Sequence, residues 1–578
     1  MLRDASTLSQ TEKDWVAKRH EATDRATKDF LNRANMTNFD VASFMDGYSP
    51  NIGIAFSGGG YRAMLNGAGV FKAFDSRTPG STSSAQMGGL VQAATYISGL
   101  SGGSWLVGSI FVNNFTTVQD LQSSSELWNL SNSVLAPEGL ADIADTADYY
   151  SQLHKEVSSK ENAGYNISLT DYWARALARQ LISGDGGPAV TFSSIAKTDQ
   201  FLNYEMPFPI IIADQKNPRQ EIVSTNTTVF EFNPLEMGSF DPTLFSFTPL
   251  EYIGSPVTNG VPNNASHCTR GFDNAAFLLG TSSSLFNIAL LELESSGIGG
   301  ILREFAEDVL HNLSESEADS GIYSPNPFYK VNRNVNPANE AISLTLVDGG
   351  QDGQNVPLQP LIQPTRNLDV VFAVDSSADT TTNWPNGTSL VATYARSLSP
   401  IQNHTDFPAI PDVNTFVNLG LNTRPSFFGC NATNITHSNF NENSILPPLI
   451  IYLPNHPYTD MSNTSTKQMS YDTESRDAII KNGYNVATMG NGTVDQEWTA
   501  CAACAIVRRG EERRGLNQTD QCKRCFTRYC WDGTRNETDP GEVEYSMLIA
   551  QKSAGTRSGP IGWKAGIVIM GTVIVGMI

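Results

Sequence analysis

Residues 98–105 read Ser98-Gly99-Leu100-Ser101-Gly102-Gly103-Ser104-Trp105, with a mostly apolar run before them (91–97) and another after them (106–111). This arrangement predicts a buried strand, a tight glycine turn and a helix. Ser101 is the centre of a G-x-S-x-G pattern, whose glycines permit the strained turn that exposes a hydroxyl at a helix N-terminus. Ser101 is therefore the candidate nucleophile.

A second glycine turn lies about forty residues upstream. Residues 51–56 predict a buried strand, Ser57-Gly58-Gly59-Gly60 its turn, and residues 61–65 the start of a helix. A single G-x-S-x-G pattern also arises by chance at plain strand-to-helix turns. A triple-glycine turn, however, leaves backbone N–H groups unobstructed at a helix N-terminus, and an oxyanion needs such donors. The two turns together favour a catalytic site.

A candidate partner for Ser101 closes a later apolar run. Asp348 follows Leu344-Thr345-Leu346-Val347 and precedes two glycines. An aspartate at the end of a buried strand can face the sheet edge that carries Ser101. On spacing alone, a solvated turn aspartate is the commoner explanation. Asp375, which closes residues 371–374, is a rival on the same reasoning.

The remaining pattern indicates an α/β fold with large insertions. Further buried strands are predicted at 209–213, 342–347, 368–374 and 449–453, separated by long segments, many of them compatible with helices. A capping box from Ser9 to Glu12 opens a polar helix through about Leu31. We therefore divide the chain into an N-terminal helical segment (1–45), a main unit (46–550) with a cysteine-rich part (501–530), and a tail (551–578).

Composition excludes some partners and indicates a compartment. The 578 residues carry a net charge of −21, which argues against binding nucleic acid and against electrostatic docking on anionic membranes. The high number of N-glycosylation sequons, fifteen, favours a glycoprotein of the secretory pathway with N-glycans. The sequon asparagines are Asn35, Asn114, Asn129, Asn166, Asn226, Asn264, Asn312, Asn386, Asn403, Asn431, Asn434, Asn463, Asn491, Asn517 and Asn536.

Seven cysteines are present, four of them in two C-x-x-C motifs, Cys501/Cys504 and Cys522/Cys525. The spacing matches a four-thiolate zinc site well, and in a cytosolic chain it would favour metal. The sequons favour disulfides, because secreted proteins fold in an oxidising compartment. The odd count leaves one cysteine with no partner in this sequence.

The two ends of the sequence differ in their targeting signals. The first residues show no apolar signal-peptide core, so either the protein is not secreted or its true N-terminus is missing from this sequence. At the other end, residues 565–578 are uncharged but span only about 21 Å as a helix, too short for a bilayer. Small residues at 553–555 and a polar spacer at 556–564 give the layout of a GPI-attachment signal. A tail anchor or a buried terminal helix is the alternative.

Three motifs in order resemble the fungal lysophospholipase / phospholipase B family: Ser57–Met64, Gly99–Trp105 and Val347–Gly350. The catalytic module of that family is similar to those of group IV cytosolic phospholipases and, more distantly, patatin. The resemblance covers nearly the whole chain, because it continues through residues 230–234, 271–274, 280–283 and 522–531. It implies a patatin-like central sheet with helices on both faces. It also implies hydrolysis of fatty acyl esters of lysophospholipids and phospholipids at a membrane or micelle surface.

Carried over residue by residue, the resemblance implies a Ser–Asp dyad, with Ser101 as nucleophile and Asp348 as base. It further implies an oxyanion hole from the amides of Gly59 and Gly60, and Arg62 near the substrate phosphate. This chemistry needs no metal or organic cofactor. Family members begin with a signal peptide and an upstream cysteine, and both are absent here. The implied location is the plasma membrane through a GPI anchor, the cell wall or the medium.

Two other hypotheses remain open from the sequence. A Ser–His–Asp hydrolase would keep the required chain order with His437 or His456 after Asp348, although neither histidine lies in a motif. A non-catalytic, GPI-anchored cell-wall glycoprotein would fit the charge and the sequons equally well. Nucleotide binding by Gly58–Gly60 is disfavoured, because the loop has neither a Walker lysine nor a G-x-G-x-x-G pattern.

Overall fold

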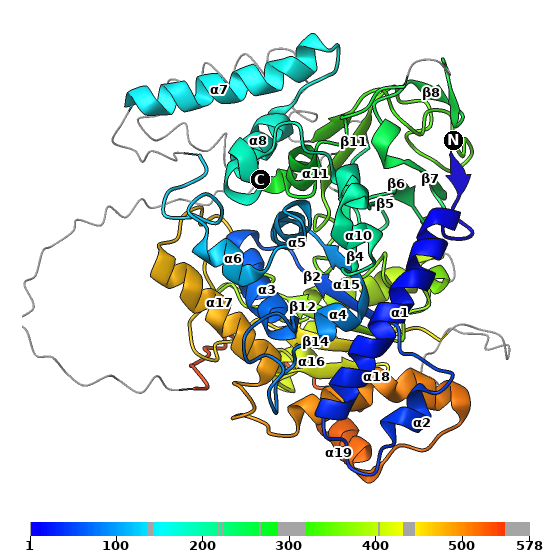
Figure 1. The fold of residues 1–578 in the computed structure, drawn as a ribbon, viewed down its shortest axis with the longest axis vertical. Coiled ribbons are helices and arrows are strands. Elements are labelled where there is room, and N and C mark those ends of the chain that lie inside the picture. The colour runs from blue at the N-terminus through cyan, green and yellow to red at the C-terminus, as the bar shows by residue number, and fades with distance from the viewer. Residues whose placement is uncertain are drawn as a thin grey trace, which may run out of the picture.

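The structure is a computed structural model that describes residues 2–549 apart from 136–142, 218–219, 221–222, 265–267, 287–319, 403–404 and 432–445. It is a mixed α/β fold around a twelve-stranded sheet of order β1-β7-β6-β5-β4-β3-β2-β12-β14-β13, with β10 and β11 attached beside β4 (Figure 1). The strands are β1 (Arg3–Asp4), β2 (Ile52–Phe56), β3 (Ala94–Gly99), β4 (Phe208–Gln215), β5 (Val229–Phe232), β6 (Glu236–Ser239), β7 (Ser246–Pro249), β10 (Gly321–Tyr323), β11 (Leu344–Asp348), β12 (Val370–Asp375), β13 (Ser426–Phe428) and β14 (Leu449–Pro454). A separate hairpin joins β8 (Val257–Thr258) and β9 (Val261–Pro262).

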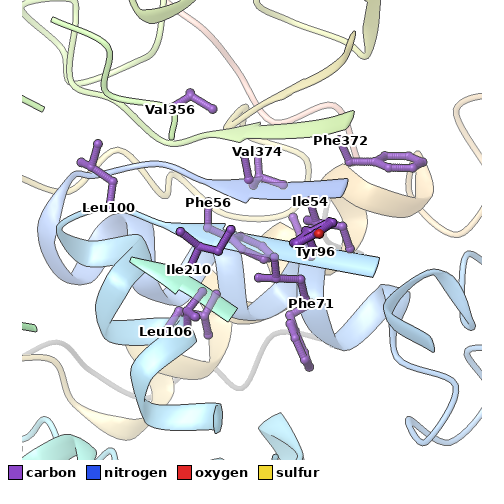
Figure 2. Close-up of a cluster of buried hydrophobic side chains, with 14 of the residues drawn as sticks. Ile54, Phe56, Phe71, Tyr96, Leu100, Leu106, Ile210, Val356, Phe372 and Val374 are labelled. Atoms are coloured by element: carbon purple, nitrogen blue, oxygen red, sulfur yellow. The ribbon is translucent and has the colours of Figure 1, made fainter. Parts of the chain in front are cut away.

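The core of the sheet is five adjacent parallel strands, β4, β3, β2, β12 and β14. Every residue of these strands is buried, as expected for parallel strands that are covered on both faces. Their side chains meet Phe71 and Leu106 from two neighbouring helices (Figure 2). The strands predicted at 51–56, 209–213, 368–374 and 449–453 are confirmed within one or two residues.

Two strand boundaries were predicted wrongly. The apolar run 91–97 is divided, because Leu90–Ala93 forms a short helix, α4, and β3 begins only at Ala94. The run 342–347 begins too early, since Ile342 is 76% exposed and β11 starts at Leu344. In both places the apolar run extends past the residues that pair in the sheet, and apolarity alone does not mark where pairing starts.

The helices are α1 (Gln10–Arg33), α2 (Val41–Met45), α3 (Gly60–Phe74), α4, α5 (Gly102–Val112), α6 (Val118–Ser123), α7 (Ile143–Asn162), α8 (Leu169–Leu181), α9 (Ser183–Gly186), α10 (Asp199–Leu202), α11 (Ala275–Thr281), α15 (Thr388–Ser397), α16 (Val413–Asn418), α17 (Thr473–Thr488), α18 (Trp498–Arg514) and α19 (Asp520–Tyr529). The helix α3 lies against α5 and α17 (Figure 1). A Cβ at Gly69 or Gly483 would overlap the backbone of the facing helix, so α3 and α17 are in close backbone contact. None of the helices in the described ranges has the length and apolarity needed to cross a bilayer.

The N-terminal helix α1 is joined to the sheet by buried charges. Ser9 Oγ accepts a hydrogen bond from the Glu12 amide, which is the Ser9 half of the predicted capping box. The Glu12 carboxylate accepts hydrogen bonds from Tyr96 of β3 at 2.9 Å and from Arg366 at 3.1 Å. Arg366 is also paired with the buried Glu231 of β5. The segment 1–45 thus packs directly onto the main unit.

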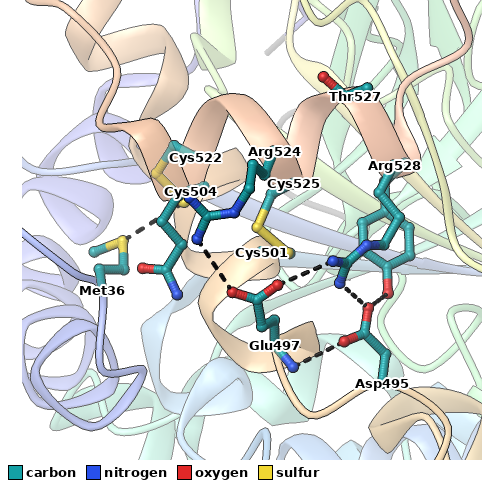
Figure 3. The surroundings of a disulfide bond; sticks show 12 residues. Met36, Asp495, Glu497, Cys501, Cys504, Cys522, Arg524, Cys525, Thr527 and Arg528 are labelled. Carbon is teal, nitrogen blue, oxygen red and sulfur yellow. Dashed lines mark hydrogen bonds and ion pairs between the residues drawn. A yellow bond between two sulfur atoms is a disulfide. The ribbon is translucent and has the colours of Figure 1, made fainter.

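The cysteine-rich part forms a helical hairpin, α18 and α19, that is crossed by two disulfides (Figure 3). Cys501 pairs with Cys525, and Cys504 pairs with Cys522, because a three-residue spacing puts both cysteines of each helix on one face. A third disulfide joins Cys430 to Cys530. The prediction of disulfides is confirmed and the zinc alternative is wrong. Cys268 is the exposed free thiol, and the described residues contain no group of side chains that could hold a metal.

Candidate active site

Ser101 lies at the strained turn between β3 and α5. Its backbone has φ 48° and ψ −120°, a conformation that residues other than glycine rarely adopt. Two close contacts fix the turn: Ser104 Oγ donates to the Ser101 carbonyl at 2.6 Å, and a Cβ at Gly102 would overlap the Gly60 carbonyl. Position 102 thus requires glycine, because the triple-glycine turn lies too close for a side chain. Ser101 is buried, with 4% of its surface exposed.

The strand β11 brings Asp348 to Ser101 from the opposite direction. One edge of β4 pairs with β5. The other edge is shared, because β3 pairs parallel with residues 208–211 and β11 pairs antiparallel with residues 213–215. β3 and β11 therefore point toward each other along this edge, and their C-terminal ends meet. Asp348 reaches the nucleophile on an antiparallel strand, whereas the prediction relied on the geometry of parallel strands.

Ser101 and Asp348 are in direct contact. Ser101 Oγ donates a hydrogen bond to Asp348 Oδ2 at 2.9 Å, and the Gly350 amide donates to Asp348 Oδ1 at 3.0 Å. Burial raises the pKa of Asp348 to about 6, although the hydrogen bonds from Gly350 and Ser101 oppose this shift. A carboxylate with this pKa is a stronger base than an exposed aspartate and is still ionised at neutral pH.

The residues that follow α11 hold both members of the pair. The Ser101 amide donates to the carbonyl and to the hydroxyl of Ser282, each at 3.1 Å. The Asp348 amide donates to Ser284 Oγ at 3.0 Å. Sequence reasoning gave these serines no role. The motif at 280–283 was visible in the sequence, but nothing in it indicated contact with residues about 180 positions upstream and 64 downstream.

The triple-glycine turn ends beside the nucleophile turn. Gly59 has φ 133° and Gly60 has φ 62°, so both adopt backbone conformations that favour glycine. Their amides lie at the N-terminus of α3, and neither donates a hydrogen bond to any group in the described part of the chain. Two adjacent unpaired amides at a helix N-terminus are suitable donors for an oxyanion.

Arg62 is buried at the start of α3 and forms no ion pair with a carboxylate of the described residues. Its Nε donates to the Ser376 carbonyl at 2.9 Å, and its Nη1 donates to the Thr464 carbonyl at 2.7 Å and to Thr466 Oγ1 at 2.9 Å. Nη2 has no hydrogen-bond partner among the described residues and lies next to Gly59. Burial lowers the pKa of Arg62 to about 10, so it remains charged at neutral pH. A buried cation with a free N–H group can receive an anionic ligand.

The rival residues lie elsewhere or are not described. Asp375 accepts hydrogen bonds from Ser377 and Tyr452 and makes none with Ser101. His456 is buried among Trp384, Tyr458 and Tyr545, and burial lowers its pKa to about 4. His437 lies outside the described residues. No histidine within the described ranges makes a hydrogen bond with Ser101 or Asp348.

The chain is similar to known proteins over most of its length. The family model described as lysophospholipase catalytic domain matches residues 52–536. Lysophospholipase 1 of Aspergillus fumigatus is 52% identical over 568 residues, which cover 96% of this chain and 88% of that protein. A lysophospholipase of Penicillium chrysogenum is 50% identical (97% and 92% covered), and lysophospholipase 1 of Saccharomyces cerevisiae is 45% identical (94% and 84% covered).

Among solved structures, human GIVD cytosolic phospholipase A2 has a similar fold. The TM-score is 0.64 at 15% sequence identity, with 89% of this chain and 68% of that chain covered. At this identity the likeness shows a shared fold and no more. The predicted cytosolic-phospholipase-like architecture is confirmed.

Proposed function

This chain belongs to the lysophospholipase catalytic-domain family and is a lipid ester hydrolase, and from that premise we propose how its residues perform the reaction. Its substrates are lysophospholipids and phospholipids at a membrane or micelle surface, and it releases their fatty acyl groups through a Ser101–Asp348 dyad. The observation that carries this proposal is the direct hydrogen bond from Ser101 Oγ to Asp348 Oδ2, which no histidine of the described ranges joins.

The reaction proceeds through an acyl-serine intermediate. Asp348 takes the proton of Ser101 as Oγ attacks the ester carbonyl, and the amides of Gly59 and Gly60 donate to the oxyanion that forms. The carbon–oxygen bond of the ester then breaks, and the proton passes from Asp348 to the leaving glycerol oxygen. Water attacks the acyl-serine with Asp348 again as base, which releases the fatty acid and restores the Ser101 hydroxyl. No cofactor is needed for these steps.

The experiment that tests the dyad is hydrolysis of labelled lysophosphatidylcholine and phosphatidylcholine by wild type, Ser101→Ala, Asp348→Ala and the control His456→Ala. We expect each dyad variant to lose at least ~10³-fold in kcat while its fold is retained, because removing nucleophile or base disables the whole unit. His456→Ala is expected to retain activity. Loss at His456 with Asp348→Ala nearly silent would refute the dyad, and an inactive wild type would favour a non-catalytic glycoprotein.

Arg62 is proposed to bind the substrate phosphate. The support is its buried charge and the unpaired Nη2 beside Gly59. Arg62→Lys keeps the charge and removes the guanidinium fork. We expect it to lower kcat/KM at least ~10-fold more for lysophosphatidylcholine than for a monoacylglycerol, which lacks phosphate. Equal losses on both substrates would instead assign Arg62 to holding the turn through Ser376 and Thr464.

We also propose that the protein is N-glycosylated in the secretory pathway and GPI-anchored, which places it at the plasma membrane, in the cell wall or in the medium. None of the twelve sequon asparagines in the described ranges is buried, and ten of them are exposed, which supports glycosylation. The tail at 551–578 lies outside the described residues, so the anchor rests on its sequence. Treatment with a peptide N-glycosidase and a phosphatidylinositol-specific phospholipase C tests both modifications by the mass lost and the protein released from membranes.

A further inference from the structure

Asn355 connects the loop that follows Asp348 to the triple-glycine turn. Its carbonyl accepts a hydrogen bond from the Gly58 amide at 3.0 Å, and its Nδ2 donates to the Gly58 carbonyl at 3.2 Å. The side chain occupies the space that a Cβ would need at Gly58 or at Gly350. Asn355 therefore holds both the N–H group and the carbonyl group of Gly58.

The hydrogen-bonded chain continues from Asn355 to a buried carboxylate. Asn355 Nδ2 also donates to Ser377 Oγ at 2.7 Å, and Ser377 Oγ donates to Asp375 Oδ1 at 2.5 Å. Asp375 further accepts from the Ser377 amide at 2.9 Å and from Tyr452 OH at 2.8 Å. All three groups are donors, and they oppose the rise that burial causes in the pKa of Asp375.

The Gly58 carbonyl belongs to the same peptide unit as the Gly59 amide. Because a trans peptide is planar, its C=O and N–H point in opposite directions, and anchoring one fixes the other. A second donor, Ser57 Oγ, reaches the Gly58 carbonyl at 3.1 Å and is itself held by the Ser376 amide at 2.7 Å. Hydrogen bonds accepted by a carbonyl also polarise its peptide, so the opposite N–H becomes a stronger donor.

We propose that Asn355, Ser377 and Asp375 are positioning residues that aim and polarise the Gly59 amide toward the oxyanion of the reaction. This inference rests on the proposed function, in which that amide stabilises the tetrahedral intermediate. Asp375 thus acts at a distance from the nucleophile, as the anchor of a chain that ends on the oxyanion donor. The C-terminal end of β12 thereby supports catalysis without contacting Ser101.

The test compares Asn355→Ala, Ser377→Ala and Ser377→Thr with a matched control, Asn326→Ala. Asn326 is buried, and its Nδ2 also donates two hydrogen bonds, to the carbonyls of Ala338 and Ala341. Active enzyme is counted by titration with an alkyl fluorophosphonate. Three quantities are measured: kcat for lysophosphatidylcholine and the inhibition constants of two inhibitors. The first inhibitor is a long-chain alkylboronic acid, which forms a tetrahedral anion on serine. The second is an ether lysolipid, which mimics the bound substrate.

We expect Asn355→Ala to lower kcat by ~10–100-fold, since an oxyanion donor is worth about 10²–10³-fold in kcat and here it is misaligned rather than removed. The inhibition constant of the alkylboronic acid should rise by a similar factor. That of the ether lysolipid should change less than about twofold, because only the tetrahedral state uses the Gly59 amide. Ser377→Ala should show a smaller effect of the same kind, and Ser377→Thr, which keeps the hydroxyl, should restore activity. Asn326→Ala should leave all three quantities unchanged per active site.

Unchanged kcat in Asn355→Ala, or ether-lysolipid binding that weakens in step with kcat, would overturn the inference. If Asn355→Ala does not fold, the Ser377→Ala and Ser377→Thr pair decides by the same criteria. A wild type that does not hydrolyse lysophosphatidylcholine, or a Ser101→Ala variant that still does, would instead contradict the proposed function, so the two failures are distinguishable.

Discussion

At the residue scale, Asp348 contacts the nucleophile directly, so its ionisation is expected to control the reaction rate. Only the carboxylate can accept the Ser101 proton, and burial raises its pKa to about 6. We therefore expect kcat/KM to rise with pH, to reach half of its maximum near pH 6 and to level off above pH 7. A water-soluble short-chain ester is the suitable substrate, because it avoids pH effects on micelles. A profile that is flat from pH 5 to pH 7 would contradict this assignment.

Burial of the Asp348 carboxylate also lowers the free energy of unfolding of the protein. A folded-state pKa near 6 lies above the unfolded value of 3.8, so ionisation is harder in the folded state and wild-type stability falls as pH rises through this window. Asp348→Asn has no charge to bury. We expect it to be inactive yet more stable than wild type by about 1–3 kcal/mol at pH 7, a difference that disappears below about pH 4. Denaturant unfolding at pH 4 and pH 7 measures both values, and an Asn variant that is less stable at pH 7 would refute the argument.

Residue patterns also show how much of the site was predictable. Ser101, the glycine turns and Asp348 became candidates because turns and strand ends have local signatures, but the family resemblance was needed to choose Asp348 over Asp375. Asn355, Ser282 and Ser284 were given no role, because their importance depends on hydrogen bonds to residues 64 to 297 positions away. An asparagine or serine in a loop has the same local pattern whether it faces solvent or supports a catalytic turn.

At the element scale, the meeting of β3 and β11 along β4 is the feature that local patterns missed. The sequence predicted both strands and the shared end of the sheet, but periodicity carries no information on direction or pairing. Among the described strands, β11 pairs with β4 and β10 alone, and it fills the edge that β3 leaves free after residue 211. The head-on geometry is a consequence of β4 being longer than β3.

The α18–α19 hairpin gives a prediction at the element scale. The Cys501–Cys525 disulfide closes a loop with a sequence separation of 24 residues. Replacing both cysteines by alanine should lower the free energy of unfolding by about 2–4 kcal/mol, because the unfolded chain gains entropy. The hairpin makes no hydrogen bond with Ser101 or Asp348 in the described residues, so kcat should be unchanged. Cys268→Ala is the matched control, since that thiol is unpaired and exposed, and it should leave stability within about 0.5 kcal/mol of wild type.

At the scale of the whole molecule, the N-terminal helix decides whether the chain divides near residue 45. The sequence sets residues 1–45 apart as an N-terminal helical segment, but α1 buries Trp15 against Phe201 and Phe208. Arg19 donates to the carbonyl of Ala94, the first residue of β3. Removing α1 would therefore expose apolar surface and leave buried polar groups without partners, and each such group costs about 1–3 kcal/mol.

We accordingly expect a chain of residues 46–549 to lack a cooperative unfolding transition, whereas residues 1–549 unfold cooperatively and hydrolyse lysophosphatidylcholine. The variant Glu12→Gln tests the contribution of the Glu12 charge while the helix is kept. It keeps an acceptor for Tyr96 and Arg366, Arg366 retains Glu231, and the variant removes a carboxylate whose pKa burial raises, so we expect the free energy of unfolding to change by less than about 1 kcal/mol with the fold intact. Thermal and denaturant unfolding measure both effects. If residues 46–549 unfold with the midpoint of the longer chain, α1 is an independent attachment and its buried contacts contribute nothing to the stability of the sheet.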